Sequence, residues 1–212
     1  MRTRKPPEER KAEILHAATT LITVRGYKKV AMIDVANSIG VSKAALYVYY
    51  PTKDALFEAV VFKSLEAPLA AIKEASMQPT EIAEKLTNML VNSFTLALYK
   101  PKPMIELINS SRKYAQDILQ DHTQQTLKLF ARALDEAQRD NKIQLSATGL
   151  STEEAAELML SCSHGAALGT TIGSPILPRD QMEQRISALV HGLINGWKSL
   201  PDQDHLYTVP PA

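Results

Sequence analysis

Residues 32–51 read MIDVANSIGVSKAALYVYYP, which is two short apolar-periodic segments joined at Gly40. The pattern predicts a helix from about Met32 to Ile39, a tight turn around Gly40, and a second helix between Ser42 and Pro51. A glycine suits the turn because a left-handed backbone there is costly for other residues. This spacing is typical of a helix-turn-helix, whose second helix enters the major groove of DNA.

The alternative for this segment is an ordinary helical hairpin inside a larger bundle. Its flanks favour contact with DNA, because the second helix carries no acid and several small or hydrogen-bonding side chains. Lys53 lies in the first turn of the next helix, where it opposes the helix dipole unless a phosphate completes the site. We therefore predict that DNA is contacted by Ser42, Lys43, Ala44, Tyr47, Tyr49 and Lys53.

The charge is unevenly distributed along the chain of 212 residues, whose net charge is +1. Residues 1–63 contain eleven lysines and arginines against six acids, a net charge of +5, and the remainder has a net charge of −4. A basic segment is attracted to a polyanion. The alternative is a chance asymmetry on a solvated surface.

Helical periodicity runs through the rest of the chain, and no sustained alternation of period two indicates a strand. The predicted fold class is all-α, with about nine helices. The first helix is expected from Pro7 or Glu8 to Arg25, and a later helix is expected to be capped by Thr52 and stopped or kinked at Pro68. Further helices are expected at about 80–98, 104–114, 115–142, 152–172 and 179–200, with a polar loop at 144–150 and a Ser151–Glu154 capping box.

Residues 10–60 resemble the DNA-binding domain of the TetR family of bacterial repressors, over about a quarter of the chain. The resemblance is carried by Gly26-Tyr27, Val35-Ala36, Ile39-Gly40-Val41-Ser42, Leu46-Tyr47, Tyr49-Tyr50, Lys53 and Ala55-Leu56. Three positions depart from the family. Ala31 replaces the usual Ser or Thr cap, Ile33 replaces a polar or basic residue, and Tyr49 replaces a frequent histidine.

The resemblance implies a ligand-responsive transcriptional repressor that binds double-stranded operator DNA as a homodimer. It implies an N-terminal three-helix DNA-binding domain over 1–55 and a larger helical effector-binding and dimerisation domain over 56–205. Dimerisation is expected through 152–172 and 179–200, which combine small residues with an apolar stripe. The alternative is that both helices pack only on the core of their own subunit.

The resemblance further implies release from DNA by a small, mainly apolar effector. The candidate lining side chains come from the helices of the larger domain, and each apolar one is also a plausible core residue. His122 is either a polar contact for the effector or a solvated side chain. The candidates are Phe62, Met89, Phe94, Met104, Ile108, His122 and Phe130.

Other classes of protein are disfavoured. Cys162 and His164 are two residues apart on a predicted helix and do not face each other, and the five histidines lack metal-ligand spacing, so we expect no enzyme, metal or cofactor. No apolar run approaches the ~18 residues of a membrane span. The charged start MRTRKPPEERK is not followed by the apolar segment of a secretory leader. A cytoplasmic location is therefore expected. The alternative function is a helical small-molecule-binding protein without a role in gene regulation.

Overall fold

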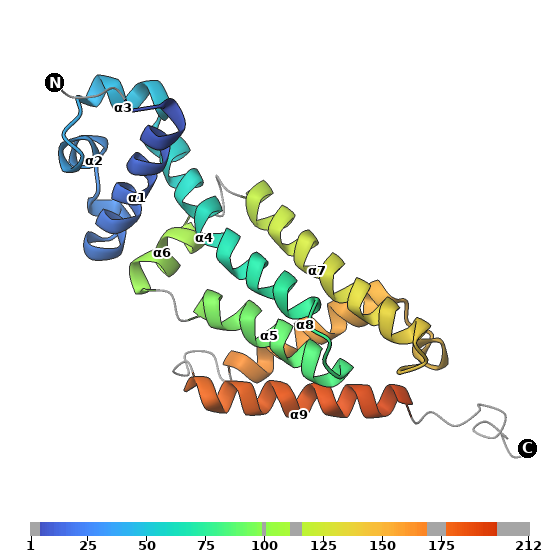
Figure 1. Ribbon diagram of the computed structural model, residues 1–212. Coiled ribbons are helices and arrows are strands. Elements are labelled where there is room, and N and C mark those ends of the chain that lie inside the picture. Colours follow the sequence, from blue (N-terminus) through green and yellow to red (C-terminus); the bar gives the residue numbers. More distant parts are fainter. Residues whose placement is uncertain (1–4, 99–100, 111–115, 169–176, 199–212) are drawn as a thin grey trace, which may run out of the picture. The chain divides into compact units, whose positions relative to one another are not determined.

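A computed structural model describes residues 5–98, 101–110, 116–168 and 177–198, which form nine α-helices and contain no β-strand (Figure 1). The all-α prediction is confirmed. The parts of the expected helices at 111–115, 169–172 and 199–200 lie outside the described residues. The helices are α1 (Pro7–Arg25), α2 (Met32–Ser38), α3 (Lys43–Tyr49), α4 (Lys53–Ser76), α5 (Ile82–Leu98), α6 (Lys102–Ser110), α7 (Gln116–Arg139), α8 (Thr152–Leu168) and α9 (Arg179–Lys198).

The chain forms two compact units, which we describe one at a time. The first unit comprises Met1–Ala67 and Ala97–His122, and the second comprises Pro68–Leu96 and Thr123–Ala212. The first unit thus adds to the helix-turn-helix the start of α4 and the whole of α6. The predicted domains, 1–55 and 56–205, are divided by their expected functions, whereas the two units are divided by their internal contacts. The predicted division therefore stays a prediction.

Two prolines lie within helices, Pro68 in α4 and Pro103 in α6. Pro68 does not stop its helix, because α4 is continuous from Lys53 to Ser76 with a buried Pro68 inside it. A proline in a helix interior costs ~3 kcal/mol, because it removes one helical hydrogen bond and crowds the preceding turn. Pro103 lies in the first turn of α6, where the amide that proline lacks would have no helical partner, so α6 begins at Lys102 rather than Met104.

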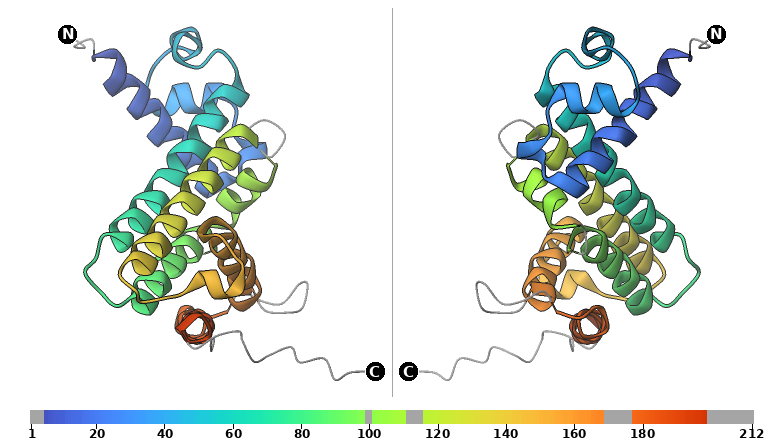
Figure 2. Two further views of the ribbon diagram at one scale, coloured as in Figure 1. Left: turned by 90° about the vertical axis from the view of Figure 1, so that its right-hand side faces the viewer. Right: turned by 90° about the vertical axis from the view of Figure 1, so that its left-hand side faces the viewer.

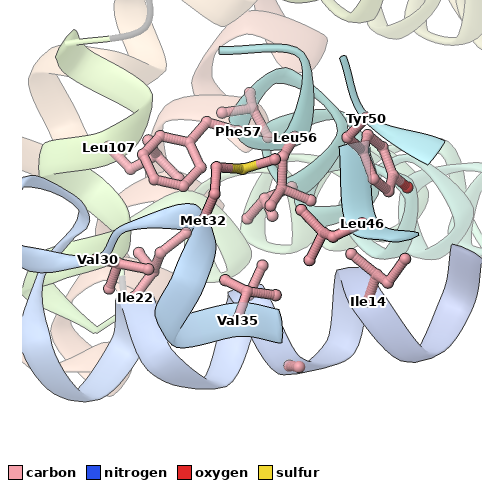
Figure 3. Close-up of a cluster of buried hydrophobic side chains, with 14 of the residues drawn as sticks. Ile14, Ile22, Val30, Met32, Val35, Leu46, Tyr50, Leu56, Phe57 and Leu107 are labelled. Atoms are coloured by element: carbon pink, nitrogen blue, oxygen red, sulfur yellow. The ribbon is translucent and has the colours of Figure 1, made fainter. Parts of the chain in front are cut away.

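The core of the first unit is a cluster of buried apolar side chains from α1, α2, α3, α4 and α6 (Figure 3). Leu46 is the one fully buried residue of α3, and it points toward Ile14 of α1 and Val35 of α2. Tyr49 packs against the edge of this core, and the other residues of α3 are exposed. Other members include Ile22, Val30, Met32, Tyr50, Leu56, Phe57, Met104 and Leu107.

In the second unit, α8 and α9 pack against each other (Figure 2). The Ser151–Glu154 capping box at the start of α8 is confirmed by its two reciprocal hydrogen bonds, of 2.8 and 3.1 Å. The expected polar loop at 144–150 contains a short 3₁₀ turn, η3 (Leu145–Thr148), and buries Leu145. The buried stripe of α9 consists of Met182, Ile186, Val190, Ile194 and Trp197.

Candidate nucleic-acid interface

The turn between α2 and α3 is held by two backbone hydrogen bonds around a left-handed glycine. Gly40 has φ +65°, its N–H donates to the Asn37 carbonyl at 3.1 Å, and the Val41 N–H donates to the Ala36 carbonyl at 3.0 Å. This is a Schellman motif, in which the residue after the helix end takes the left-handed conformation. The expected helix-turn-helix is therefore present, with the glycine at the position that requires it.

The start of α2 shows how the chain manages without the usual Ser or Thr cap. Ala31 is the N-cap residue, and a methyl side chain cannot accept a hydrogen bond. The carboxylate of Asp34 instead accepts from the Ala31 N–H at 2.7 Å, which is one half of a capping box. The negative charge of Asp34 in this first turn also suits the helix dipole.

The second helix, α3, begins with a side-chain cap and presents one face to solvent. The Ser42 hydroxyl oxygen accepts from the Ala45 N–H at 3.1 Å, as the sequence predicted for this residue. Lys43, Ala44 and Tyr47 are exposed, and Tyr49 is half-buried beside the core. All of the predicted DNA-contacting residues lie on or next to α3, within the first unit.

Two lysines of the predicted set lie over aromatic rings four residues along the chain. The Lys43 ammonium is 5.6 Å from the centroid of the Tyr47 ring, and the Lys53 ammonium is 4.9 Å from the centroid of the Phe57 ring. Phe57 also contacts Tyr27 edge to face, with centroids 6.4 Å apart. A ring face attracts a cation, so it offsets the unfavourable position of Lys53 in the first turn of α4.

Other basic side chains of the N-terminal segment are paired within the chain. The hydrogen bond from Lys5, at 2.8 Å, holds the pKa of the Glu13 carboxyl below its usual value, and Arg10, at 2.6 Å, lowers that pKa further. Lys28 and Lys29 are exposed in the short turn η1 (Tyr27–Lys29) that follows α1. The positive charge of the segment is thus presented in part by residues close in sequence to α2.

Sequence reasoning missed two exposed residues of α3, Ala45 and Val48. Val48 is 79% exposed, the highest exposure among the large apolar side chains recorded for the described residues. Its exposure could have been inferred, because Val48 lies two residues from the inward-facing Leu46 and the helical period turns it outward. Attention to polar side chains alone passed over it.

The seven candidate effector residues are divided between the two units. Phe62 is 52% exposed, Met104 belongs to the core of the first unit, and Ile108 packs against that core. His122 is half-buried. The remaining three, Met89, Phe94 and Phe130, are buried in the second unit.

The second unit also contains two recesses of ligand size. The larger, about 730 Å³, is lined by α4, α5 and α9 with mostly polar side chains, among them Glu74, Asn92 and Arg179. The smaller, about 360 Å³, is lined by α4, α5 and α7 and includes Lys85 and Arg132. The seven candidate effector residues line neither recess, so their role stays a prediction.

The residues considered for catalysis do not form a reactive group. Cys162 is exposed, and a ring nitrogen of His164 lies 3.0 Å from the backbone carbonyl of Leu160 on its own helix. Among the residues that the structure describes, no three His, Cys, Asp or Glu side chains are grouped to hold a metal ion. No helix in the described part of the chain has the length and apolar content that a membrane crossing requires.

The helix-turn-helix is a DNA-binding motif, and comparisons with known proteins agree with this interpretation. Residues 14–60 match the model of the family of bacterial regulatory proteins, tetR family. The transcriptional activator FasR of Mycolicibacterium smegmatis is 30% identical over 83 residues, 39% of this chain and 38% of that protein. The transcriptional repressor KstR2 of the same species is 22% identical over 138 residues, 63% of this chain and 67% of that protein.

A solved structure assigned to the same family, from Mesorhizobium loti, has a TM-score of 0.71 at 16% identity, covering 91% of this chain and 98% of that one. Residues 14–60 therefore resemble the DNA-binding domain of the tetR family, and the chain as a whole has the fold of a solved structure assigned to that family. The matched region spans well under half the length of FasR, 38%.

Proposed function

We propose that this regulator is a repressor that binds operator DNA as a dimer and is released by a small, mainly apolar effector. The observation that carries the DNA-binding part is the exposed face of α3, which the Gly40 turn and the buried Leu46 hold away from the core. Lys43 and Ala44 contact base edges in the major groove, and Tyr47 and Lys53 contact phosphates. Ser42 and Tyr49 complete the contact surface at the two ends of the helix.

The DNA-binding proposal is tested by selecting duplexes from a random library with the purified chain and measuring affinity for an enriched duplex. Lys53→Ala should weaken binding to all duplexes, because a phosphate contact carries no sequence information. Lys73→Ala is the matched control, since Lys73 is exposed near the other end of the same helix, α4, and belongs to the second unit. Failure to enrich any sequence would contradict the proposal.

The dimer proposal rests on the outward faces of α8 and α9. The sequence predicted that the apolar stripe of α9 contacts a second subunit. Most of this stripe is buried inside its own chain, so this part of the expectation is corrected. The outward faces instead carry three exposed glycines, Gly165, Gly192 and Gly196, at which an added Cβ would meet nothing within 4 Å. Glycine in a helix costs ~1 kcal/mol relative to alanine. Open glycines are useful where the backbone of a partner helix approaches closely.

Sedimentation at micromolar concentration tests the dimer. The wild-type chain should sediment as a dimer, and Gly165→Arg or Gly192→Arg should give folded monomers, because each substitution places a long charged side chain between approaching helices. Gln138→Arg, at an exposed position of α7, is the control and should leave the dimer intact. A wild-type monomer under these conditions would contradict the proposal.

The effector proposal relies on the large apolar side chains of the second unit, among them Met89, Phe94 and Phe130. A ligand that binds the DNA-free form with a preference of about 1.4 kcal/mol lowers DNA affinity tenfold. The test is fluorescence anisotropy of a labelled, selected duplex during titration with a library of small apolar compounds. Release by one compound, weakened in Phe130→Ala, supports the proposal. A chain that binds such a compound but selects no duplex would instead fit a helical small-molecule-binding protein.

A further inference from the structure

The centre of the exposed face of α3 is formed by carbon atoms rather than by hydrogen-bonding groups. Ala44 and Val48 lie two residues before and after the fully buried Leu46, so both point away from the core. They are four residues apart and therefore neighbours on the helix surface. Ala45, also exposed, borders the same patch. We call Ala44, Ala45 and Val48 the methyl patch.

Two polar side chains beside the methyl patch in sequence, Ser42 and Lys43, make contacts with α3 itself. The Ser42 hydroxyl oxygen accepts from the Ala45 N–H, and the Lys43 ammonium lies over the Tyr47 ring. Ile33, on α2, is also exposed (43%) where a hydrogen-bonding side chain is usual in the family. The surface that faces a bound duplex under the proposed function is therefore apolar at its centre and cationic at its edges.

The major groove offers one apolar group to such a patch. Every base pair presents hydrogen-bond donors or acceptors there, but only thymine presents a methyl group, at C5. Resting on the proposed function, we infer that Ala44 and Val48 read thymine methyl groups, so that operator half-sites contain thymine at the base pairs facing the middle of α3. Lys43 contacts base edges beside the patch, and Lys53, further along the sequence, supplies the attraction to the phosphates.

An isolated exposed valine also occurs on ordinary protein surfaces. Val24, in the last turn of α1, provides the comparison because it is 76% exposed, belongs to the same unit and lies outside the helix-turn-helix. Its truncation removes the same atoms from a similarly exposed site. Val24→Ala is therefore the matched control for Val48→Ala. Alanine favours a helix more than valine, so neither variant should unfold its helix.

The experiment first selects operator half-sites from a random duplex library, and then replaces each conserved thymine in turn by deoxyuridine. Deoxyuridine keeps the base pairing and removes only the C5 methyl group. At one or two thymines, the replacement should weaken binding of the wild-type chain about fourfold. This is the loss expected when one methyl group is no longer buried in the complex. The same ratio should be found for Val24→Ala. For Val48→Ala, the ratio at one of these positions should fall to about one.

Four results would overturn the inference. Selected half-sites without conserved thymine, or deoxyuridine replacements without effect at every position, would show that methyl groups are not read although the chain binds DNA. An unchanged ratio in Val48→Ala would assign the methyl contact to another residue. Failure to enrich any sequence would refute the proposed function and this inference with it. The other results refute only the inference, because in them the chain still selects and binds DNA.

Discussion

Replacing Gly40 by alanine should destabilise the first unit by a predictable amount. Gly40 has φ +65°, and both hydrogen bonds of the turn require this conformation. For an L-residue with a Cβ, the left-handed conformation costs roughly 1–2 kcal/mol. The substitution should therefore reduce the ratio of folded to unfolded molecules about five- to thirtyfold.

The chain contains its own reference for the size of this effect. Asn141, after α7, has φ +56° and ends its helix with the same pair of hydrogen bonds, from Asn141 to Gln138 at 3.1 Å and from Lys142 to Ala137 at 2.8 Å. Asparagine tolerates the left-handed conformation better than alanine, because its short polar side chain bonds locally. Gly40→Asn should accordingly cost less than Gly40→Ala.

The assay is urea-induced unfolding followed by circular dichroism, with hydrogen exchange of peptides covering residues 32–50 to localise the destabilised segment. The expected order of stability is wild type, Gly40→Asn, Gly40→Ala, with an unchanged dependence on urea concentration. Gly40→Ala as stable as the wild type, or less damaging than Gly40→Asn, would refute the reasoning from backbone conformation.

Three further predictions concern charge, pH and a second turn. Lys53→Ala should reduce the slope of log affinity against log salt by about one, because one phosphate is no longer neutralised, and an unchanged slope would argue against a phosphate contact. Hydrogen bonding to Ser151 lowers the pKa of the Glu154 carboxyl below its usual value of 4.5. The backbone N–H of Ser151 has the larger effect and its hydroxyl the smaller. The resulting stability is present above that pH and disappears as pH falls through the lower folded pKa. Glu154→Gln keeps the cap without titrating, so urea midpoints at pH 6 and pH 3 should differ less for this variant than for the wild type, and equal differences would exclude the cap as their source. Asn141→Gly should raise the free energy of unfolding by about 0.5 kcal/mol, which an unchanged or lowered urea midpoint would contradict.

The helix-turn-helix could be predicted nearly to the residue because its signals are local. Gly40, Ser42 and Pro51 each act on the backbone within a few positions, and the observed bounds of α2 and α3 follow them. Pro68 also acts locally, but α4 continues through it from Lys53 to Ser76, so this proline does not end its helix. Local signals such as glycine, serine caps and proline therefore predict the helix ends of the helix-turn-helix well, but proline alone does not predict a helix end in α4.

The partner-facing and ligand-facing surfaces were harder to predict for a physical reason. Helical periodicity shows which side of α9 is apolar, but Ile186 and Val190 look the same whether they bury against their own chain or another. Likewise, Met89 and Phe130 have the same pattern as core residues or as walls of a cavity. Three-dimensional burial separates the first pair of cases, because it places Ile186 and Val190 in the interior of their own chain. Met89 and Phe130 are also buried, as residues of a core or of a cavity wall both are, so their effector role stays a prediction.

The aromatic rings beneath Lys43 and Lys53 influence the thermodynamics of association as well as the local charge. A free lysine side chain loses up to ~2 kcal/mol of rotamer entropy when it is fixed in one position. Each of these lysines is already confined above a ring in the unbound chain, at 5.6 Å for Lys43 and 4.9 Å for Lys53. Part of the entropic cost of ordering the cations is thus met during folding. The rings should therefore make the binding entropy of the two lysines less unfavourable, which calorimetry of DNA association would register.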